Sequence, residues 1–386
     1  MKKKILYIQP YASHVGGVDS VLLQLIDGLN KNIYEPFVVL PNQSPYVEKY
    51  QKLGATVLFE PLAVFGKPTS WKYYIENFYI LIKSIGRLKK IVKNHKIDLI
   101  HSHKMELMGG NIVGKILNVP TVQTIHELPR NPLIAYKAVG YLNHLFNDAV
   151  IVLCNRSKSV MEWGRLKSNK VRKIYNGISI KDNNPLGSNI REELNLSKED
   201  KIAITVARLS PMKGIEFLLD AANELKKENP NLKFVIIGDV AFEHEKEYKE
   251  VLINKSKKLN LEGTVFFLGL RRDVPSLLNQ SDIFILPSVY DIFPTVILEA
   301  MSCSIPIVGT DVGGVPEMVR NNTGIIVPAS DSRKLAQGVK EILNNDYKLM
   351  GKNGRELLER EFTQEKYVSQ TVEIYEGLLK IGDSYE

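Results

Sequence analysis

The sequence predicts an α/β fold made of two Rossmann-like, doubly wound domains, each built on a parallel sheet. Three observations lead to this prediction. Short apolar runs of strand length alternate with longer stretches of helical periodicity along the chain. The alternation occurs twice, once on each side of a polar segment at 181–201. At 386 residues the chain is too long for one ordinary core, and it fits two domains of about 100 to 200 residues.

The expected strands fall into two similar sets. In the first half, buried strands are expected at 5–9, 37–41, 55–59, 98–102, 120–126 and 149–154. The second half repeats the pattern at 202–208, 233–239, 264–269, 282–288, 305–310 and 324–328. Helical stretches such as 20–29 separate the strands, an order typical of βαβ units on a parallel sheet.

The boundary between the domains is predicted from a change in composition. The segment 181–200 is rich in turn formers and charge but has little to bury. It is therefore the predicted linker between an N-terminal domain at 1–180 and a C-terminal domain at 201–361.

The composition is typical of a globular protein in a reducing compartment. Hydrophobic residues make up 44% and charged residues 24%, and no run of eighteen apolar residues occurs, which argues against a membrane-spanning helix. Gln9 and Pro10 limit the first apolar run to strand length, so we interpret it as a strand and not as a signal peptide. Cys154 and Cys303 lack metal-ligand spacing and are expected to be reduced packing residues of a cytoplasmic protein.

Positive charge is concentrated in the first half of the chain. Residues 1–180 hold 25 Lys and Arg against 11 Asp and Glu, net +14, whereas 181–386 hold 26 against 32, net −6. The first half is therefore expected to meet an anionic partner.

Within the first half, the segment 71–96 mixes apolar residues with seven basic residues and one acid. Such a helix suits an anionic bilayer, and equally suits a sheet-covering role with a solvated basic face. Nucleic acid is the poorer partner, because no recognition motif accompanies the charge.

Two acids in the stretch YDIFPTVILEAM predict a ligand site. Pro294 fits the first turn of a helix, which places Asp291 in the preceding loop and Glu299 in the second turn. The first-turn N–H groups of Thr295 and Val296 then point outward and attract phosphate. The loop directly follows an expected strand, at the sheet edge where α/β proteins bind ligands. The two carboxylates would accept hydrogen bonds from hydroxyls on either side of the phosphates.

A second motif, ARLSPMKG, supplies the cations that phosphates need. Arg208 and Lys213 flank a turn at the end of the strand expected at 202–208. A bidentate arginine and a lysine point charge suit a diphosphate. The alternative is that both are ordinary surface charges and that Asp291 only caps its loop.

The N-terminal half also has polar and glycine-rich strand ends. Gly16 and Gly17 let the backbone approach a ligand closely just before a helix start, although a plain tight turn explains them too. His126 ends the strand expected at 120–126 and is either functional or structural. His101 and His103 end a neighbouring strand, where acceptor-side or packing roles are expected and no third ligand has the spacing of a zinc site.

Together these motifs resemble glycosyltransferase family 4, and the likeness covers nearly the whole chain. The family's E-x7-E element matches Asp291 and Glu299, and its R-x4-K element matches Arg208 and Lys213. Further matches are GGV at 16–18, TIHEL at 124–128, NGI at 176–178, LGLRRDVPSLLNQSDIFILPS and TDVGGVPEMV. The departures are Asp291 where the family usually has Glu, Ser304 where Gly is common, and Ser179 in place of Asp after NGI.

The resemblance implies the GT-B fold, with the two domains facing each other across a cleft and the last helix, at 362–386, packing back on the N-terminal domain. It implies that Arg208 and Lys213 hold the donor diphosphate, that Glu299 binds the ribose, and that His126 lies beside the anomeric centre of the donor sugar. The catalytic set is then His126, Arg208, Lys213 and Asp291. The remaining donor-binding residues are Gly17, Arg271, Phe293, Pro294, Thr295 and Val296, and the acceptor-side residues are Gly16, His103 and Glu127.

The function implied is retaining transfer of a sugar from a nucleotide diphosphate sugar, such as a UDP-sugar, to an acceptor hydroxyl. Fixed cations at the leaving phosphate would replace a metal, and neither a metal nor another cofactor is expected. The expected acceptor is a glycan or glycolipid, such as a lipid-linked or cell-surface polysaccharide precursor, reached from the cytoplasm at the inner face of the membrane. Alternatives on the same scaffold are a nucleotide-sugar epimerase, a phosphorylase, and a non-catalytic module that binds sugar nucleotides.

Overall fold

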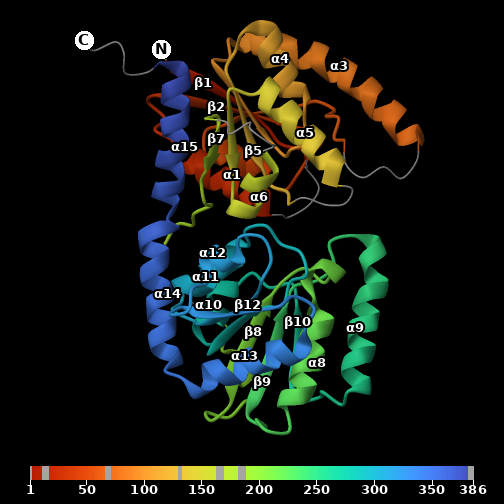
Figure 1. Ribbon diagram of the computed structural model, residues 1–386, viewed down its shortest axis with the longest axis vertical. Helices are drawn as coiled ribbons and strands as arrows, with labels where there is room; N and C mark the ends of the chain where they lie inside the picture. Colours follow the sequence, from red (N-terminus) through yellow and green to blue (C-terminus); the bar gives the residue numbers. More distant parts are fainter. Residues whose placement is uncertain are drawn as a thin grey trace. The chain divides into compact units, whose positions relative to one another are not determined.

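The computed structural model describes residues 2–10, 17–65, 71–128, 133–161, 169–180 and 188–380, without the side chains of 71, 74, 133–136, 160 and 244. Contacts divide the chain into two units. The first unit comprises Met1–Gly177 and Gln364–Glu386, and the second unit comprises Ile178–Thr363. The predicted class is confirmed, because each unit is built on one parallel sheet with helices on both faces (Figure 1).

The sheet of the first unit has seven parallel strands in the order β3-β2-β1-β4-β5-β6-β7. Their bounds are β1 Lys3–Ile8, β2 Tyr34–Leu40, β3 Thr56–Phe59, β4 Leu99–His103, β5 Thr121–Ile125, β6 Ala149–Val152 and β7 Val171–Lys173. The strand order reverses between β1 and β4, and such a reversal opens a crevice at the carboxyl ends of the two strands. The sequence predicted the first six of these strands but missed the short β7.

Alternate side chains of each strand pack on opposite faces of this sheet, because the side-chain period of a strand is two. Ile5 and Tyr7 lie in a core formed with α1 and α15, whereas Leu6 and Ile8 lie in a core formed with α3 and α4. The helices of the unit are α1 Gly17–Gly28, α2 Val47–Lys52, α3 Trp71–His95, α4 Gly109–Leu117, α5 Leu133–Phe146, α6 Asn155–Met161 and α15 Gln364–Leu379. The C-terminal helix α15 is thus part of the first unit, and its buried Tyr375 belongs to the first of these cores.

The sheet of the second unit has six parallel strands in the order β10-β9-β8-β11-β12-β13. Their bounds are β8 Lys201–Val206, β9 Leu232–Ile237, β10 Val265–Gly269, β11 Ile283–Leu286, β12 Ile307–Thr310 and β13 Gly324–Val327. All six were predicted from the sequence. The order again reverses once, between β8 and β11, so the loops that follow these two strands lie side by side.

Helices cover both faces of the second sheet (Figure 1). One face packs against α8, α9 and α13, with Phe234 and Ile236 of β9 in the shared core. The helical elements are α7 Ile190–Glu193, η1 Pro211–Lys213, α8 Ile215–Leu225, η2 Glu243–Glu245, α9 Lys246–Lys258, α10 Val274–Asn279, α11 Thr295–Ser302, α12 Val315–Met318, α13 Ser332–Asn344 and α14 Tyr347–Glu361. In the described part of the chain, no helix combines the length and the apolar character needed to cross a bilayer.

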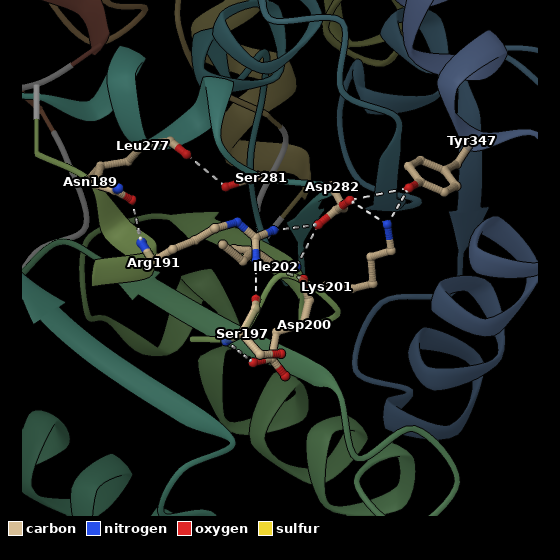
Figure 2. Close-up of polar contacts among 10 residues, drawn as sticks. All are labelled: Asn189, Arg191, Ser197, Asp200, Lys201, Ile202, Leu277, Ser281, Asp282 and Tyr347. Carbon is tan, nitrogen blue, oxygen red and sulfur yellow. Dashed lines mark hydrogen bonds and ion pairs between the residues drawn. The ribbon is translucent and has the colours of Figure 1, made fainter. Parts of the chain in front are cut away.

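The segment predicted to be a linker differs from expectation over its described part. Residues 181–187 lie outside the description, but from Ser188 onward the segment packs on the second unit. Ile190 is fully buried, and its backbone N–H donates to Gln280 at 3.0 Å. Arg191 extends this anchoring, because its guanidinium donates to the carbonyls of Ser197 and Asp200 at 2.7 and 3.1 Å (Figure 2). Ser188 adds a hydrogen bond to Asp273 at 2.7 Å, so a few specific contacts dock a segment whose composition offers little to bury.

An aspartate placed just before a strand recurs at the amino-terminal edges of both sheets. Each of these aspartates accepts a hydrogen bond, at 2.7 to 2.9 Å, from a backbone N–H near the start of the neighbouring strand. The pairs are Asp98 with Lys4, Asp148 with Thr121 and Asp282 with Ile202. In the second unit, the carboxylate of Asp282 also contacts polar side chains (Figure 2). The carboxylate of Asp282 lies 3.2 Å from the ammonium of Lys201 and 3.3 Å from the hydroxyl of Tyr347.

Replacing Asp282 by alanine should destabilise the second unit. The carboxylate is largely buried, and its removal leaves the N–H of Ile202 and the ammonium of Lys201 without this acceptor. We expect the free energy of unfolding to fall by roughly 2 to 4 kcal/mol, measured by urea titration followed by circular dichroism. Glu243→Ala, which removes an exposed ion pair with Lys246, is the control and should change stability little. Equal effects of the two substitutions would contradict the prediction.

Candidate functional site

The two sequence motifs of the C-terminal half lie together in the second unit. Because β8 and β11 are neighbours, the turn after β8 meets the loop after β11. The carbonyl of Met212 accepts hydrogen bonds from the N–H groups of Val289 and Tyr290, at 2.9 and 3.1 Å. Gly214, with φ +64°, packs so closely that an added Cβ would lie 2.1 Å from the carbonyl oxygen of Pro287. A cationic turn and an acidic loop, 75 to 80 residues apart in the chain, thus form one structure.

Lys213 and Asp291 are brought into direct contact. The lysine ammonium lies 2.6 Å from the Asp291 carboxylate, which also accepts a hydrogen bond from the Ser288 hydroxyl at 3.2 Å. Both charged side chains are mostly buried, with 23% and 13% of their surfaces exposed. An ammonium has three donors, so this pair fixes the lysine while leaving it able to bind an anion.

Helix α11 begins just beyond this pair. Pro294 is its N-cap residue, and no side chain caps its first turn. The N–H groups of Thr295 and Val296 make no hydrogen bond within the described residues, and a helix start of this kind attracts phosphate. The loop before the helix is held by Gly313, where an added Cβ would lie 2.2 Å from the carbonyl oxygen of Asp291.

Arg208 is held by a residue that sequence reasoning missed. Its Nε lies 3.5 Å from Oε1 of Glu245, and its guanidinium lies over the ring of Phe242 at 5.2 Å. Glu245 is buried, and its other oxygen accepts hydrogen bonds from the N–H groups of Ala241 and Phe242 at 2.9 and 3.2 Å. In the sequence Glu245 is one acid of a highly charged stretch, and only its position at a helix start sets it apart.

The environment of Glu299 differs from that of Asp291. Its carboxyl group has no hydrogen-bond or ion-pair partner among the described residues, and burial raises its pKa above the ordinary value. A half-buried acceptor without a protein partner is suited to receive hydrogen bonds from the hydroxyl groups of a ligand.

The guanidinium of Arg271, in contrast to the carboxyl group of Glu299, is fully engaged with protein partners. It donates to Asp273 at 2.8 and 2.9 Å and to Glu193 at 2.7 Å, so its predicted role in donor binding gains no support from its contacts.

In the first unit, three histidines form a column at the ends of β4 and β5. His101 stacks on His103, with ring centroids 4.5 Å apart, whereas the nearly parallel rings of His103 and His126 meet at their edges, with centroids 5.3 Å apart. Nδ1 of His103 lies 3.0 Å from Nε2 of His126. His101 is anchored at both nitrogens, 2.6 Å from the hydroxyl of Tyr375 and 2.7 Å from that of Thr124. His101 therefore has the packing role that the sequence left open, whereas His126 is only half-buried.

Glu127 belongs to a buried group of charges beside this column. Its Oε2 accepts hydrogen bonds from the N–H groups of Met105 and His126 at 3.0 and 3.1 Å. Lys104 has φ +102°, a rare conformation for a residue with a side chain, and its ammonium lies 3.1 Å from Glu106. Burial, aided by the negative charge of Glu106, raises the pKa of Glu127 to about 7.

The glycines predicted at the first helix start are only partly described. Gly16 lies outside the described residues. Gly17 begins α1, and an added Cβ there would have nothing within 4 Å, so it faces open space. The helix start is fixed by Asp19, whose carboxylate accepts hydrogen bonds from Gln9 and Tyr50 at 3.1 and 3.0 Å.

In the described part of the chain, no group of three or more His, Cys, Asp or Glu side chains is arranged so that it could hold a metal ion.

Replacing Glu127 by glutamine should change how stability depends on pH. The pKa of this carboxyl group is about 7 in the folded chain, against 4.5 for an ordinary glutamate. The folded state therefore holds a proton that the unfolded state releases, and ionisation of Glu127 opposes folding as the pH rises through this window. The stability of Glu127→Gln relative to the parent should rise between about pH 5 and pH 7, by up to about 1.4 kcal/mol per pH unit.

Urea titrations across that pH range measure the effect. Glu48→Gln removes an exposed carboxylate whose pKa is lowered by the side chain of Lys52, and it serves as the control that should show no such rise. A Glu127→Gln profile parallel to that of the parent would contradict the prediction.

Comparison with known proteins identifies the class to which this fold and site belong. A model described as Glycosyltransferase Family 4 matches residues 15–182, and a model described as Glycosyl transferases group 1 matches residues 188–357. Together the two matches cover most of the chain, which is a glycosyltransferase and belongs to glycosyltransferase family 4. The resemblance seen in the motifs is thereby confirmed.

Individual relatives give the same class. The chain is 25% identical over 375 residues to the UDP-Gal:alpha-D-GlcNAc-diphosphoundecaprenol alpha-1,3-galactosyltransferase of Escherichia coli, covering 92% of this chain and 95% of the relative. It is 31% identical over 194 residues to the N-acetyl-alpha-D-glucosaminyl L-malate synthase of Bacillus anthracis, covering 50% and 49%.

Solved structures agree on the fold. HepE of Anabaena in complex with UDP matches with a TM-score of 0.81 at 22% identity, over 97% of this chain and 100% of that chain. A glycosyltransferase from Rickettsia africae matches with a TM-score of 0.82 at 19% identity, over 98% and 99%. These likenesses confirm the GT-B fold class predicted from the motifs.

Proposed function

We propose that this glycosyltransferase moves a sugar from a UDP-sugar to an acceptor hydroxyl with retention at the anomeric carbon. The observation that carries the proposal is the joining of Lys213, Asp291 and the start of α11 in the second unit. The Escherichia coli relative is named for a UDP-galactose donor, and HepE of Anabaena was solved with UDP. Both names support a uridine nucleotide as the leaving group.

The charges of the second unit suit a departing diphosphate. As the glycosidic bond breaks, negative charge grows on the leaving phosphate. The ammonium of Lys213 and the free N–H groups at the start of α11 stabilise that charge without moving, because the Asp291 contact already fixes the lysine. Arg208, oriented by Glu245, adds a second cation. This electrostatic set performs the task of a metal ion, and we propose that transfer is metal-independent.

The carboxylates then have binding roles and not nucleophilic ones. Glu299 has no side-chain partner among the described residues and is the proposed acceptor for ribose hydroxyls. Asp291 is one methylene shorter than the glutamate usual in the family and is already bonded to Lys213. We therefore propose that it positions the lysine as well as contacting the donor sugar. The acceptor attacks from the face of the leaving group, and a phosphate oxygen takes its proton. The roles assigned to Gly17, His103, His126 and Glu127 stay predictions.

The donor is tested with a panel of sugar nucleotides. Thermal unfolding of the full chain is measured with UDP-, GDP- and ADP-sugars, because a ligand of the folded state raises the unfolding temperature. The stabilising donor is then incubated with acceptors, with and without a chelator. We expect a UDP-sugar to stabilise the chain and transfer to be insensitive to chelation. Epimerised sugar without transfer, dependence on inorganic phosphate, or binding without turnover would each overturn the proposal in favour of a stated alternative.

A lipid-linked acceptor is the proposed partner, because helix α3 presents an apolar row to solvent. Ile75, Phe78, Tyr79 and Ile82 follow one another at helical spacing and are each 56 to 59% exposed. The helix packs on the sheet through its C-terminal half, where Leu88 and Val92 are buried. A purely sheet-covering helix would not leave four large apolar side chains in water. Exposed basic residues flank the row, among them Lys72, Lys83 and Arg87, and the combination complements an anionic bilayer.

Mutating this row should abolish membrane binding. We expect the parent to sediment with vesicles of phosphatidylcholine and phosphatidylglycerol at physiological salt, and the double variant Phe78→Glu, Ile82→Glu to stay in solution. The matched control is Val251→Glu with Leu349→Glu, which changes two side chains of the second unit that are 58% and 52% exposed. Absence of sedimentation by the parent would contradict the proposal, as would equal loss in the control.

A further inference from the structure

The contact between His103 and His126 determines which nitrogen of His126 faces outward. Nε2 of His126 lies 3.0 Å from Nδ1 of His103. Nδ1 of His126 has no partner among the described residues, and the residue is only half-buried. The free nitrogen of His126 is therefore Nδ1. His103 is fully buried, and its own second nitrogen, Nε2, has no hydrogen-bond partner in the described part of the chain.

Both rings are neutral at physiological pH. Burial lowers the pKa of His126 to about 3 and holds that of His103 well below its usual range. A neutral imidazole has one N–H donor and one acceptor nitrogen. One of the two rings must therefore donate across the 3.0 Å contact, and the direction of that bond fixes the state of all four nitrogens.

The two possible directions leave different groups unsatisfied on His103. If His126 donates from Nε2, then Nδ1 of His103 is the acceptor and its buried Nε2 carries an N–H without an acceptor. If His103 donates from Nδ1, its buried Nε2 is a bare acceptor nitrogen. Among backbone groups, buried N–H donors without partners are rarer than under-satisfied acceptors, and applying the same preference to the ring nitrogens favours donation by His103.

We propose that His103 is a positioning residue that holds His126 in the tautomer with its hydrogen on Nδ1, so that His126 presents an N–H donor to the substrate. His126 then acts as a hydrogen-bond donor to a sugar or phosphate oxygen and not as a general base. The identity of that substrate rests on the proposed function. The tautomer of His126 is a property of the chain without substrate, so it can be tested independently of the proposed function.

The remaining contacts of the column support this assignment. His101 stacks on His103 and is fixed by Tyr375 of α15 and Thr124 of β5. The His103 ring is thus held in place from the side opposite His126, within one unit. A ring that is fully buried, stacked on His101 and hydrogen-bonded at its edge to His126 has little freedom to rotate and exchange its nitrogens.

The tautomer is measured on the full chain without any substrate. Histidine labelled with 15N is incorporated, and a long-range 1H–15N correlation spectrum distinguishes protonated from bare ring nitrogens. The signals of His126 are identified by their loss in His126→Asn. We expect Nδ1 of His126 to be protonated and Nε2 to be bare. A spectrum with the hydrogen on Nε2 would overturn the proposal.

Substitutions of His103 test whether this residue determines the tautomer of His126. His103→Asp supplies only an acceptor and should place a hydrogen on Nε2 of His126. His103→Leu supplies no partner and should give a mixture of tautomers. Turnover in both should fall by about tenfold or more with a smaller change in donor KM. Tyr375→Phe removes a hydroxyl from the same column without touching the His103–His126 contact, and it should leave the spectrum of His126 unchanged.

The outcomes separate this inference from the proposed function. Wild-type tautomers in a folded His103→Leu or His103→Asp variant would show that His103 does not set the state of His126. A shift in Tyr375→Phe as large as that in His103→Leu would assign the effect to packing. If the spectra follow the expectation while no sugar nucleotide binds, the proposed function fails and the tautomer assignment stands.

Discussion

Lys213→Ala should lower kcat by about a hundred- to a thousandfold while the chain stays folded, because a fixed cation at a developing charge contributes on that scale. The ammonium contacts Asp291, three residues before the N-cap Pro294 of α11, and the start of this helix is where the proposed leaving phosphate binds. Its loss also leaves the Asp291 carboxylate uncompensated, so this acid would repel the donor and raise the donor KM. The measurement is steady-state transfer with the UDP-sugar that best stabilises the chain.

Two further variants make the result interpretable. Lys255→Ala breaks another ion pair of the second unit, with Asp220 at 2.7 Å and with similar partial burial, and it should leave kcat near the parent value. Lys213→Ala combined with Asp291→Asn removes both charges, and it should restore part of the donor KM but little of kcat. Near-normal turnover in Lys213→Ala would contradict the role of the lysine and the site built on it.

Gly214→Ala should both destabilise the second unit and weaken donor binding. Its φ of +64° is unfavourable for alanine, and the added Cβ would lie 2.1 Å from the carbonyl oxygen of Pro287. Because backbone atoms have to move, the turn that carries Lys213 would separate from the loop that carries Asp291. We expect a loss of roughly 3 kcal/mol or more in unfolding free energy, together with a rise in donor KM.

The chain offers a closely matched control for this prediction. Gly263 has φ +69°, but an added Cβ there would meet nothing within 4 Å. Gly263→Ala therefore carries the conformational strain alone, about 1 to 2 kcal/mol, and should not affect donor binding. Thermal unfolding and donor titration are measured on both variants. If the two substitutions reduce stability equally and give the same donor KM, the close packing of Gly214 against Pro287 does not determine the geometry of the site.

The fold was largely predictable because its signal is local. Short apolar runs between helical stretches identify strands by their own composition, and all of the longer strands were found in this way. The three-residue strand Val171–Lys173 was missed because it has one buried apolar residue, too few to form a pattern. The docking of 188–200 was not predicted because it depends on Ile190 and Arg191 finding specific partners elsewhere in the second unit, Gln280 and Asp282.

The candidate site was predictable in part. Arg208, Lys213, Asp291 and Glu299 stand in motifs with fixed spacing at strand ends, and the positions of such ends follow from the strand pattern itself. Glu245 was not predictable, because an acid in a charged helical stretch is most often solvated. Its selection as the partner of Arg208 depends on the end of β9 approaching the end of β8 within the sheet.

The sequence by itself determined which residues are available at the carboxyl ends of the strands, because strand periodicity and proline and glycine positions act over a few residues. Only the tertiary structure decided which of them pair. The contacts Lys213–Asp291, Arg208–Glu245 and His103–His126 join residues 78, 37 and 23 positions apart. Each ionisable or polar side chain had several possible partners of suitable chemistry. The order and register of the parallel strands brought one of them into contact, and partial burial strengthens such a contact because polar interactions are stronger where less water surrounds them.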